Sequence, residues 1–313
     1  MKNYKYRHIS VLGKEIVSAL VHEKCRLIVD CTLGGGGHSE LLLSSLPEEA
    51  CLIGIDQDPV ALDAASARLS VFGSRFIPRL ANFREIDKVI KEINEGAPDS
   101  ILMDLGLSSG QLDNEMRGFS FQKDGPLDMR MSPNTRKTAS DLVNSLSQIE
   151  LEEIFRDYGE ERYSRRIARS ILEARYKKPI TTTGELVNLI VDSVSGKRGK
   201  IHPATRVFQA LRIAVNDEMG SLIEGLTKAI FSLNKWGVIA VISYHSLEDR
   251  IVKKEFMRLS GRCICPSGLP LCKCGRELLL ELRSKKPVLS TENEIKSNPR
   301  ARSAKLRVAM RIA

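Results

Sequence analysis

The stretch IVDCTLGGGGHSELLL, residues 28–43, decides the fold class, because it joins a short apolar run to a helix-like segment through four consecutive glycines. Strand, glycine turn and helix in this order present a ligand at the carboxyl ends of the strands in a doubly wound sheet. Gly34, Gly36 and Ser39 form G-x-G-x-x-S, an imperfect version of the dinucleotide-binding pattern. Such turns also occur for packing reasons, so the pattern needs support from elsewhere in the chain.

The alternation of apolar runs and helix-like segments continues on the C-terminal side of this stretch. β-rich runs end at Asp30, Asp56, Pro78 and Asp104. The alternation stops near residue 110 and resumes after the insert with a helix-like segment and apolar runs at 237–243 and 305–312. Alternating strands and helices are typical of a parallel sheet covered by helices. We therefore predict an α/β fold, with a Rossmann-like domain of residues 1–109 and 217–313 interrupted by a mainly helical domain of residues 110–216.

Composition narrows the class of protein. A chain of 313 residues can bury one large core or two modest ones. The apolar runs are too short to span a bilayer, and the polar start of the chain has no signal-peptide pattern, so we expect a cytoplasmic protein. Seven cysteines, an odd number, argue against a disulfide framework.

The formal net charge is +9, and most of the excess lies near the C-terminus. Residues 283–313 contain nine Lys or Arg against two Glu. Within this region, residues 282–303 have the least regular sequence pattern. A basic tail of this kind fits a nucleic-acid phosphate backbone and fits a solvated surface equally well.

Acidic residues at strand ends indicate the type of cofactor. Asp56 follows Gly36 by twenty positions, where a carboxylate can accept hydrogen bonds from both hydroxyls of a ribose. Together with Asp30 and Asp104 it gives an acid-rich set of strand ends. That set favours S-adenosylmethionine, which is cationic, over a nicotinamide dinucleotide, whose pyrophosphate is anionic. The alternative is that the aspartates only cap strands and turns.

Five longer motifs carry a resemblance to a known family. They are GGGGHS at 34–39, DLGLSSGQLDNEMRGFSFQKDGPLDMRM at 104–131, HPATRVFQALRIAVNDE at 202–218, SYHSLEDRIVK at 243–253 and NPRARSAKLR at 298–307. In this order the motifs closely resemble the bacterial small-subunit ribosomal RNA cytosine-N4 methyltransferases, the MraW or RsmH family. The resemblance covers nearly the whole chain, from HISVL at 8–12 onward.

The resemblance implies a methyltransferase that uses S-adenosylmethionine to methylate the exocyclic amine of one cytidine in the decoding region of small-subunit ribosomal RNA. The helical insert would be its substrate domain, and small-subunit ribosomal RNA within the assembled subunit its expected partner. The oligomeric state is left open, with a homodimer among the alternatives. The family's cofactor positions correspond to Gly36, Gly37, His38, Asp56, Phe83, Asp104 and Gln111. Two alternatives remain: a non-catalytic RNA-binding assembly factor, and a methyltransferase for another substrate.

The catalytic group is less clear, because the N-P-P-Y tetrapeptide of many amino-methyltransferases is missing and DLGLSS occupies its place. Cytosine's amine is a weak nucleophile, so nearby hydrogen-bond acceptors would help, and one group must receive a proton. Asp104, Ser108 and Ser109 are the candidates at the end of the fourth strand.

The segment RGFSFQKDGPLDMRM combines aromatic and basic residues, as single-stranded RNA sites do. The candidate substrate-binding residues are Arg117, Phe119, Phe121, Lys123 and Arg130. The alternative is that both phenylalanines belong to the core of the insert. A second basic set recurs at helical spacing and consists of Arg162, Arg165, Arg166 and Arg169.

The sequence CICPSGLPLCKCG places Cys263, Cys265, Cys272 and Cys274 in a C-x-C-x6-C-x-C pattern. Four thiolates can close a tetrahedral structural zinc site, although pairs separated by two residues are commoner. The alternative is a reduced loop with four free thiols.

Overall fold

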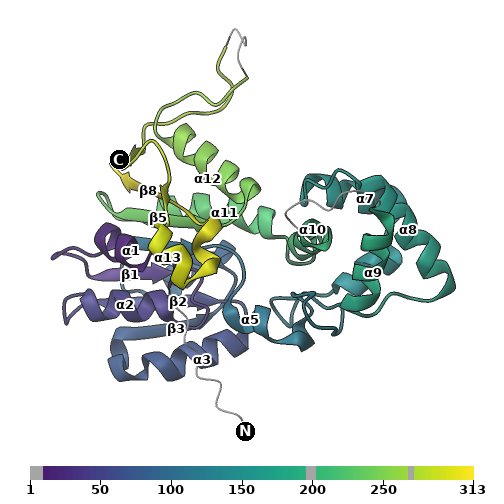
Figure 1. Cartoon of the computed structure of the whole chain (residues 1–313). Coiled ribbons are helices and arrows are strands. Elements are labelled where there is room, and N and C mark those ends of the chain that lie inside the picture. Colours follow the sequence, from purple (N-terminus) through teal and green to yellow (C-terminus); the bar gives the residue numbers. More distant parts are fainter. Residues whose placement is uncertain (1–9, 195–201, 267–270) are drawn as a thin grey trace. The chain divides into compact units, whose positions relative to one another are not determined.

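The computed structural model describes residues 10–194, 202–266 and 271–313, without the side chain of Ser109 (Figure 1). It divides into two compact units: unit 1 comprises Met1–Gly106 and Gly220–Ala313, and unit 2 comprises Leu107–Met219. The domain bounds predicted from the sequence, 109/110 and 216/217, differ from these unit bounds by three residues each.

Unit 1 is built on one mixed sheet. Its strands are β1 (Leu27–Asp30), β2 (Cys51–Asp56), β3 (Phe76–Leu80), β4 (Ser100–Asp104), β5 (Val238–Ser243), β6 (Leu280–Leu282), β7 (Val288–Leu289) and β8 (Lys305–Arg311). The strand order is β3-β2-β1-β4-β5-β8-β6, with β7 paired to β8. Strands β1 to β5 run parallel, and β8 is antiparallel to β5. The predicted doubly wound α/β fold is confirmed.

Helices cover both faces of this sheet. They are α1 (Gly13–Leu20), α2 (Gly37–Ser45), α3 (Pro59–Leu69), α4 (Ile86–Ile93), α11 (Glu218–Ser232), α12 (Ser246–Leu259) and α13 (Glu292–Ser297), with 3-10 turns η1 (Ser70–Arg75), η2 (Phe83–Glu85) and η4 (Pro299–Ser303). Strand β1 shows the two-sided packing: Leu27 and Val29 belong to one apolar cluster, and Ile28 belongs to the other. Burial on both faces explains why the parallel strands are continuous apolar runs.

The segment 282–303, whose sequence has the least regular pattern, contains β7, α13 and η4. Long-range hydrogen bonds hold it: the Glu294 carboxylate accepts from the Leu12 amide at 2.7 Å. Several C-terminal basic residues likewise have partners within unit 1. Arg307 donates to Asp249 at 2.7 Å, and Arg311 donates to the carbonyl of Phe231 at 2.8 Å. The basic C-terminal segment is therefore part of the sheet and not a free tail.

Unit 2 is mainly helical, as predicted. Its helices are α5 (Ser109–Asp113), α6 (Ala139–Ser145), α7 (Gln148–Asp157), α8 (Ser164–Lys177), α9 (Thr183–Ser193) and α10 (Ala204–Asn216), with the 3-10 turn η3 (Glu115–Arg117). Capping boxes at Thr138, Ser147 and Thr182 fix the starts of α6, α7 and α9. The helices enclose a separate apolar core that includes the fully buried Phe155. Within the described part of the chain, we find no helix with the length and apolar character needed to cross a membrane.

Candidate active site at the carboxyl ends of the strands

The chain leaving β1 is bonded to both neighbouring strands. On one side the amide of Leu33 donates to the carbonyl of Ile55 in β2 at 3.0 Å. On the other side the amide of Asp104 in β4 donates to the hydroxyl of Thr32 at 2.6 Å. The order β3-β2-β1-β4-β5 reverses direction between β1 and β4, which is where doubly wound sheets bind their ligands. The carboxyl edge of β1, β2 and β4 is therefore the candidate site.

The glycine loop brings bare backbone to this edge. Gly36 precedes α2 with φ at 75°, and a Cβ there would lie 3.2 Å from both Ala65 and Leu69 of α3. Gly37 is the first residue of α2. Glycine at 36 is required because the backbone turns with positive φ and packs tightly against α3. This placement is compatible with the cofactor role predicted for Gly36 and Gly37.

Asp56 organises the start of the loop. One carboxylate oxygen accepts from the amide of Gly34 at 2.8 Å, and the other accepts from the amide of Asp58 at 2.9 Å. Burial raises the pKa of Asp56 to about 6, and the two backbone hydrogen bonds, which favour the ionised carboxylate, limit this rise. Each carboxylate oxygen can accept a second hydrogen bond. Asp56 can therefore receive two hydroxyls while it holds the loop.

Asp30 has a structural role. It is 1% exposed and accepts from the Ser39 hydroxyl at 2.7 Å and from the Thr32 amide at 3.1 Å. Asp30 therefore caps the turn after its strand, as the alternative interpretation of the strand-end aspartates predicted, and is not a cofactor contact. Ser39 is likewise buried and serves this bond.

His38 lies between the N-terminal part of the chain and Asp104. Its ring is 6% exposed, with Nε2 2.8 Å from the carbonyl of Val11 and Nδ1 3.4 Å from Oδ2 of Asp104. A carbonyl only accepts, so Nε2 carries a hydrogen. Nδ1, on the opposite side of the ring, faces the carboxyl group of Asp104. His38 thus orients Asp104.

Asp104 is held from its other side by Tyr244, a residue that the sequence analysis missed. The Tyr244 hydroxyl donates to Oδ1 of Asp104 at 2.8 Å. Burial raises the pKa of Asp104, while His38 and the hydrogen bond from Tyr244 lower it. A signal for Tyr244 was present in SYHSLEDR: Asp104 pairs with Ile242 across β4 and β5, and Tyr244 follows at the same edge.

Phe83 begins η2 close to the end of β2, since the amide of Ala81 donates to the carbonyl of Asp56 at 3.0 Å. Its ring packs on Gly225 of α11, where an added Cβ would lie 2.5 Å from Cδ2 of Phe83. Gly225 therefore sets the position of the Phe83 ring. No pattern in the sequence marked Gly225.

Gln111, Ser108 and Ser109 belong to unit 2. Ser108 caps α5: its hydroxyl accepts from the amide of Gln111 at 3.3 Å, and Oε1 of Gln111 accepts from the amide of Ser108 at 3.1 Å. Ser109 is the first residue of this helix, and its side chain lies outside the described residues. Their predicted roles in cofactor binding and catalysis stay predictions.

The predicted RNA-binding segment of unit 2 needs correction. Phe119 is 6% exposed and lies in the core of unit 2, so it is not available to stack on a base. Phe121 is partly buried and stacks on His202, with 4.9 Å between ring centroids. For these rings the core alternative is the better description. Sequence could not distinguish the two, because aromatic residues serve both purposes.

The cations of the same segment differ in availability. Arg117 donates to the carbonyl of Arg130 at 2.9 Å, and Arg130 pairs with Asp128 at 2.7 Å. Both guanidinium groups therefore stabilise the segment itself. Lys123 is 68% exposed, although its ammonium lies 3.3 Å from Glu115. Elsewhere in unit 2, Arg162, Arg165, Arg166 and Arg169 are exposed, just before α8 or in its first half, and Arg169 pairs with Glu173 at 2.8 Å.

Comparison with known proteins places these features in a family. The profile described as the MraW methylase family matches residues 5–312. A protein of Carboxydothermus hydrogenoformans, named ribosomal RNA small subunit methyltransferase H, is 50% identical over 310 residues, covering 99% of each chain. The protein of the same name from Brevibacillus brevis is 46% identical over 314 residues and covers 100% of each. Among solved structures, an rRNA methylase from Streptococcus thermophilus gives a TM-score of 0.42 at 10% identity, covering 96% of this chain and 94% of that chain.

Proposed function

The chain belongs to the MraW methylase family, and from this premise we propose that it uses S-adenosylmethionine to methylate the N4 amine of one cytidine in the decoding region of small-subunit ribosomal RNA. The observation that carries the proposal is the joint placement of the glycine loop, Asp56 and Asp104 at the carboxyl ends of neighbouring parallel strands. The relatives' shared name, ribosomal RNA small subunit methyltransferase H, supports the class of substrate.

The side chains at this edge fit S-adenosylmethionine better than a dinucleotide. Asp56 has acceptor capacity left for the two ribose hydroxyls. Asp104 adds a second acidic group, and a cationic ligand would favour its ionised form. A pyrophosphate would meet repulsion from both carboxylates. When bound, S-adenosylmethionine supplies a methyl group made electrophilic by its positively charged sulfur.

The protein's part in the reaction is to position groups and exclude water. Gly36, Gly37 and Phe83 shape the cofactor side of the site in this proposal. Tyr244 and His38 hold the two oxygens of Asp104 in fixed directions. We assign Asp104 the acceptor role toward the cytosine amine, with Ser108 and Ser109 supplying further acceptors.

Unit 2 supplies the proposed RNA contacts. The exposed arginines Arg162, Arg165, Arg166 and Arg169, together with Lys123, offer cations for phosphates. Phosphate contacts position an RNA without reading its sequence, so they suit a structured substrate such as the small subunit. The target cytidine must turn out of any stack to reach a methyltransferase site.

The test uses small subunits from cells that lack the gene, incubated with the purified protein and labelled S-adenosylmethionine. Nucleoside mass spectrometry of the digested RNA should find new N4-methylcytidine. Asp104→Asn should abolish the product, and Glu49→Gln, at an exposed side chain of the same unit, should leave it unchanged.

Other outcomes would replace the proposal. A methyl group on another nucleoside or on ribosomal protein would show that the substrate assignment is wrong. Normal cofactor binding and RNA binding without any transfer, to naked RNA or to subunits, would favour the non-catalytic assembly factor.

A further inference from the structure

A hairpin outside the active site carries four of the seven cysteines. It connects α12 to β6, and its base is closed by backbone hydrogen bonds: the amide of Gly261 donates to Glu277 at 2.7 Å, and the amide of Glu277 donates to Arg258 at 3.0 Å. The described arms of the hairpin are residues 261–266 and 271–278, and none of their residues is buried. Apolar packing therefore does not hold the arms together.

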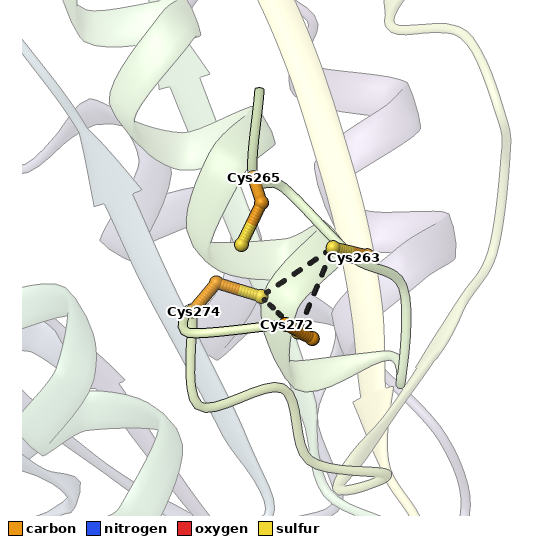
Figure 2. A group of neighbouring side chains, drawn as sticks. All are labelled: Cys263, Cys265, Cys272 and Cys274. Carbon is orange, nitrogen blue, oxygen red and sulfur yellow. Dashed lines mark hydrogen bonds between the residues drawn. The ribbon is translucent and has the colours of Figure 1, made fainter. Parts of the chain in front are cut away.

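The four cysteine sulfurs converge where apolar packing is missing. Cys263 and Cys265 lie on one arm, Cys272 and Cys274 lie on the other, and their side chains point toward a common centre (Figure 2). The Sγ atoms of Cys272 and Cys274 are 3.3 Å apart, those of Cys263 and Cys272 are 3.6 Å apart, and those of Cys263 and Cys274 are 4.0 Å apart. All four sulfurs lie within 4.8 Å of one another.

These separations match one particular chemistry. A disulfide would bring two sulfurs to about 2.05 Å. Four thiolates at about 2.3 Å from one tetrahedral zinc ion have sulfurs about 3.8 Å apart. The observed spacings lie around the second value. A cluster of several iron atoms needs its cysteine sulfurs farther apart than a single ion does.

The backbone of the hairpin suits thiolates. The amide of Lys273 donates to Sγ of Cys265 at 3.4 Å. Arg258, at the base of the hairpin, donates to the carbonyl of Gly275 at 2.7 Å. The amide donor stabilises the negative charge of a four-thiolate site, whereas Arg258, paired with Glu255 at 2.7 Å, fixes the backbone of the hairpin.

We propose that Cys263, Cys265, Cys272 and Cys274 bind one Zn²⁺ ion as thiolates in a closed tetrahedral site, and that this ion fixes the conformation of the hairpin. Each thiol releases its proton as the ion binds, and all four positions are occupied by protein, so the site is structural. The proposal concerns only the hairpin and does not depend on the proposed methyl transfer.

The first experiment measures metal in the full-length protein, purified without chelator and without added metal. Elemental analysis should find one zinc per chain. The double variant Cys263→Ser/Cys272→Ser should fall to background. Cys51→Ser, at a half-buried thiol outside the hairpin, should keep its zinc. Replacing zinc by Co²⁺ should give the visible absorption of tetrahedral cobalt thiolates.

A second experiment reports on conformation and does not need the variants. Arg262, Lys273 and Arg276 make the hairpin a trypsin substrate. The zinc-loaded protein should resist cleavage there, and a zinc chelator should accelerate cleavage at these three positions more than elsewhere.

Three results would overturn the proposal. Metal-free protein with seven titratable thiols after denaturation would show a reduced loop. Metal-free protein with only three titratable thiols would show two disulfides, and iron in place of zinc would show a different centre. Cofactor binding is measured on the same samples, so that normal binding by metal-free protein shows that only the zinc proposal has failed and the proposed function has not.

Discussion

Replacing Tyr244 by phenylalanine removes one hydroxyl from the candidate site and keeps the ring. That hydroxyl donates to Oδ1 of Asp104 at 2.8 Å, and the Asp104 side chain is only 17% exposed. A hydrogen bond to a charged group contributes about 1.5–3 kcal/mol, and a buried acceptor that loses its donor keeps the desolvation cost. We therefore expect Tyr244→Phe to lower the free energy of unfolding of unit 1 by about 2 kcal/mol.

The loss should depend on pH with a defined sign. Burial raises the pKa of Asp104, and the bond from Tyr244 lowers it, so this bond favours the ionised carboxylate. A group with a raised pKa in the folded state contributes stability at low pH that is lost as the pH rises through the folded value. Removing the Tyr244 hydroxyl raises that pKa further, so the gap between variant and wild type should widen as the pH rises from the ordinary aspartate range through the raised folded pKa.

The assay is urea unfolding followed by the fluorescence of Trp236, which is the single tryptophan and lies in unit 1. With a slope of about 2 kcal/mol per molar urea, the midpoint should fall by about 1 M. In an Asp104→Asn background the bond is between neutral groups, so Tyr244→Phe should cost about half as much and show no pH dependence. Equal losses in both backgrounds at every pH would refute the reasoning.

Three further changes test other parts of unit 1. Burial raises the pKa of Asp56 to about 6, so the affinity for S-adenosylmethionine, measured by calorimetry, should fall about tenfold per pH unit below that value. Asp56→Asn should remove this pH dependence, and a pH-independent affinity of the wild type would contradict the prediction. Gly36→Ala should lower the free energy of unfolding, measured thermally, by about 2–4 kcal/mol, because strain from the positive φ and crowding at 3.2 Å add together. The control Gly261→Ala has a φ of 76° but its nearest contact at 3.7 Å, so it should lower the free energy of unfolding by only about 1–2 kcal/mol. Equal losses for the two variants would exclude crowding at Gly36. Despite burial, the guanidinium of Arg307 lowers the pKa of Asp249, so Asp249→Asn should cost about 3–5 kcal/mol near neutral pH in urea unfolding. The penalty should shrink as the pH falls below the ordinary aspartate pKa toward the lowered folded pKa, and an unchanged midpoint at neutral pH would show that the pair contributes nothing.

The parts of the fold that the sequence predicts are those with local signals. The parallel strands are buried on both faces, so β1, β2 and β4 stand out as apolar runs that end in aspartate. Because parallel strands end at one edge, the neighbourhood of Asp56 and Asp104 could be inferred as well. The segment 282–303 could not be predicted, because bonds such as Glu294 to Leu12 join residues far apart in the chain.

The site itself is only partly readable from sequence. Phe119 and Arg130 have the residue types of an RNA-binding loop, yet one fills a core and the other pairs with Asp128. The same residue type serves either purpose, and only packing distinguishes them. Tyr244 was missed for the opposite reason: it lies 140 positions from Asp104, and only the pairing of β4 with β5 brings them together.

The position of β8 also constrains the order in which the protein can fold during synthesis. This strand lies between β5 and β6, although it follows both in the chain. Until residues 305–311 have left the ribosome, the outer edge of β5 has no neighbour and the apolar faces of the sheet stay incomplete. Unit 2 is contiguous and earlier in the chain, so its folding need not wait. A nascent chain paused before β8 would expose an open strand edge, which makes it a target for chaperones and for aggregation.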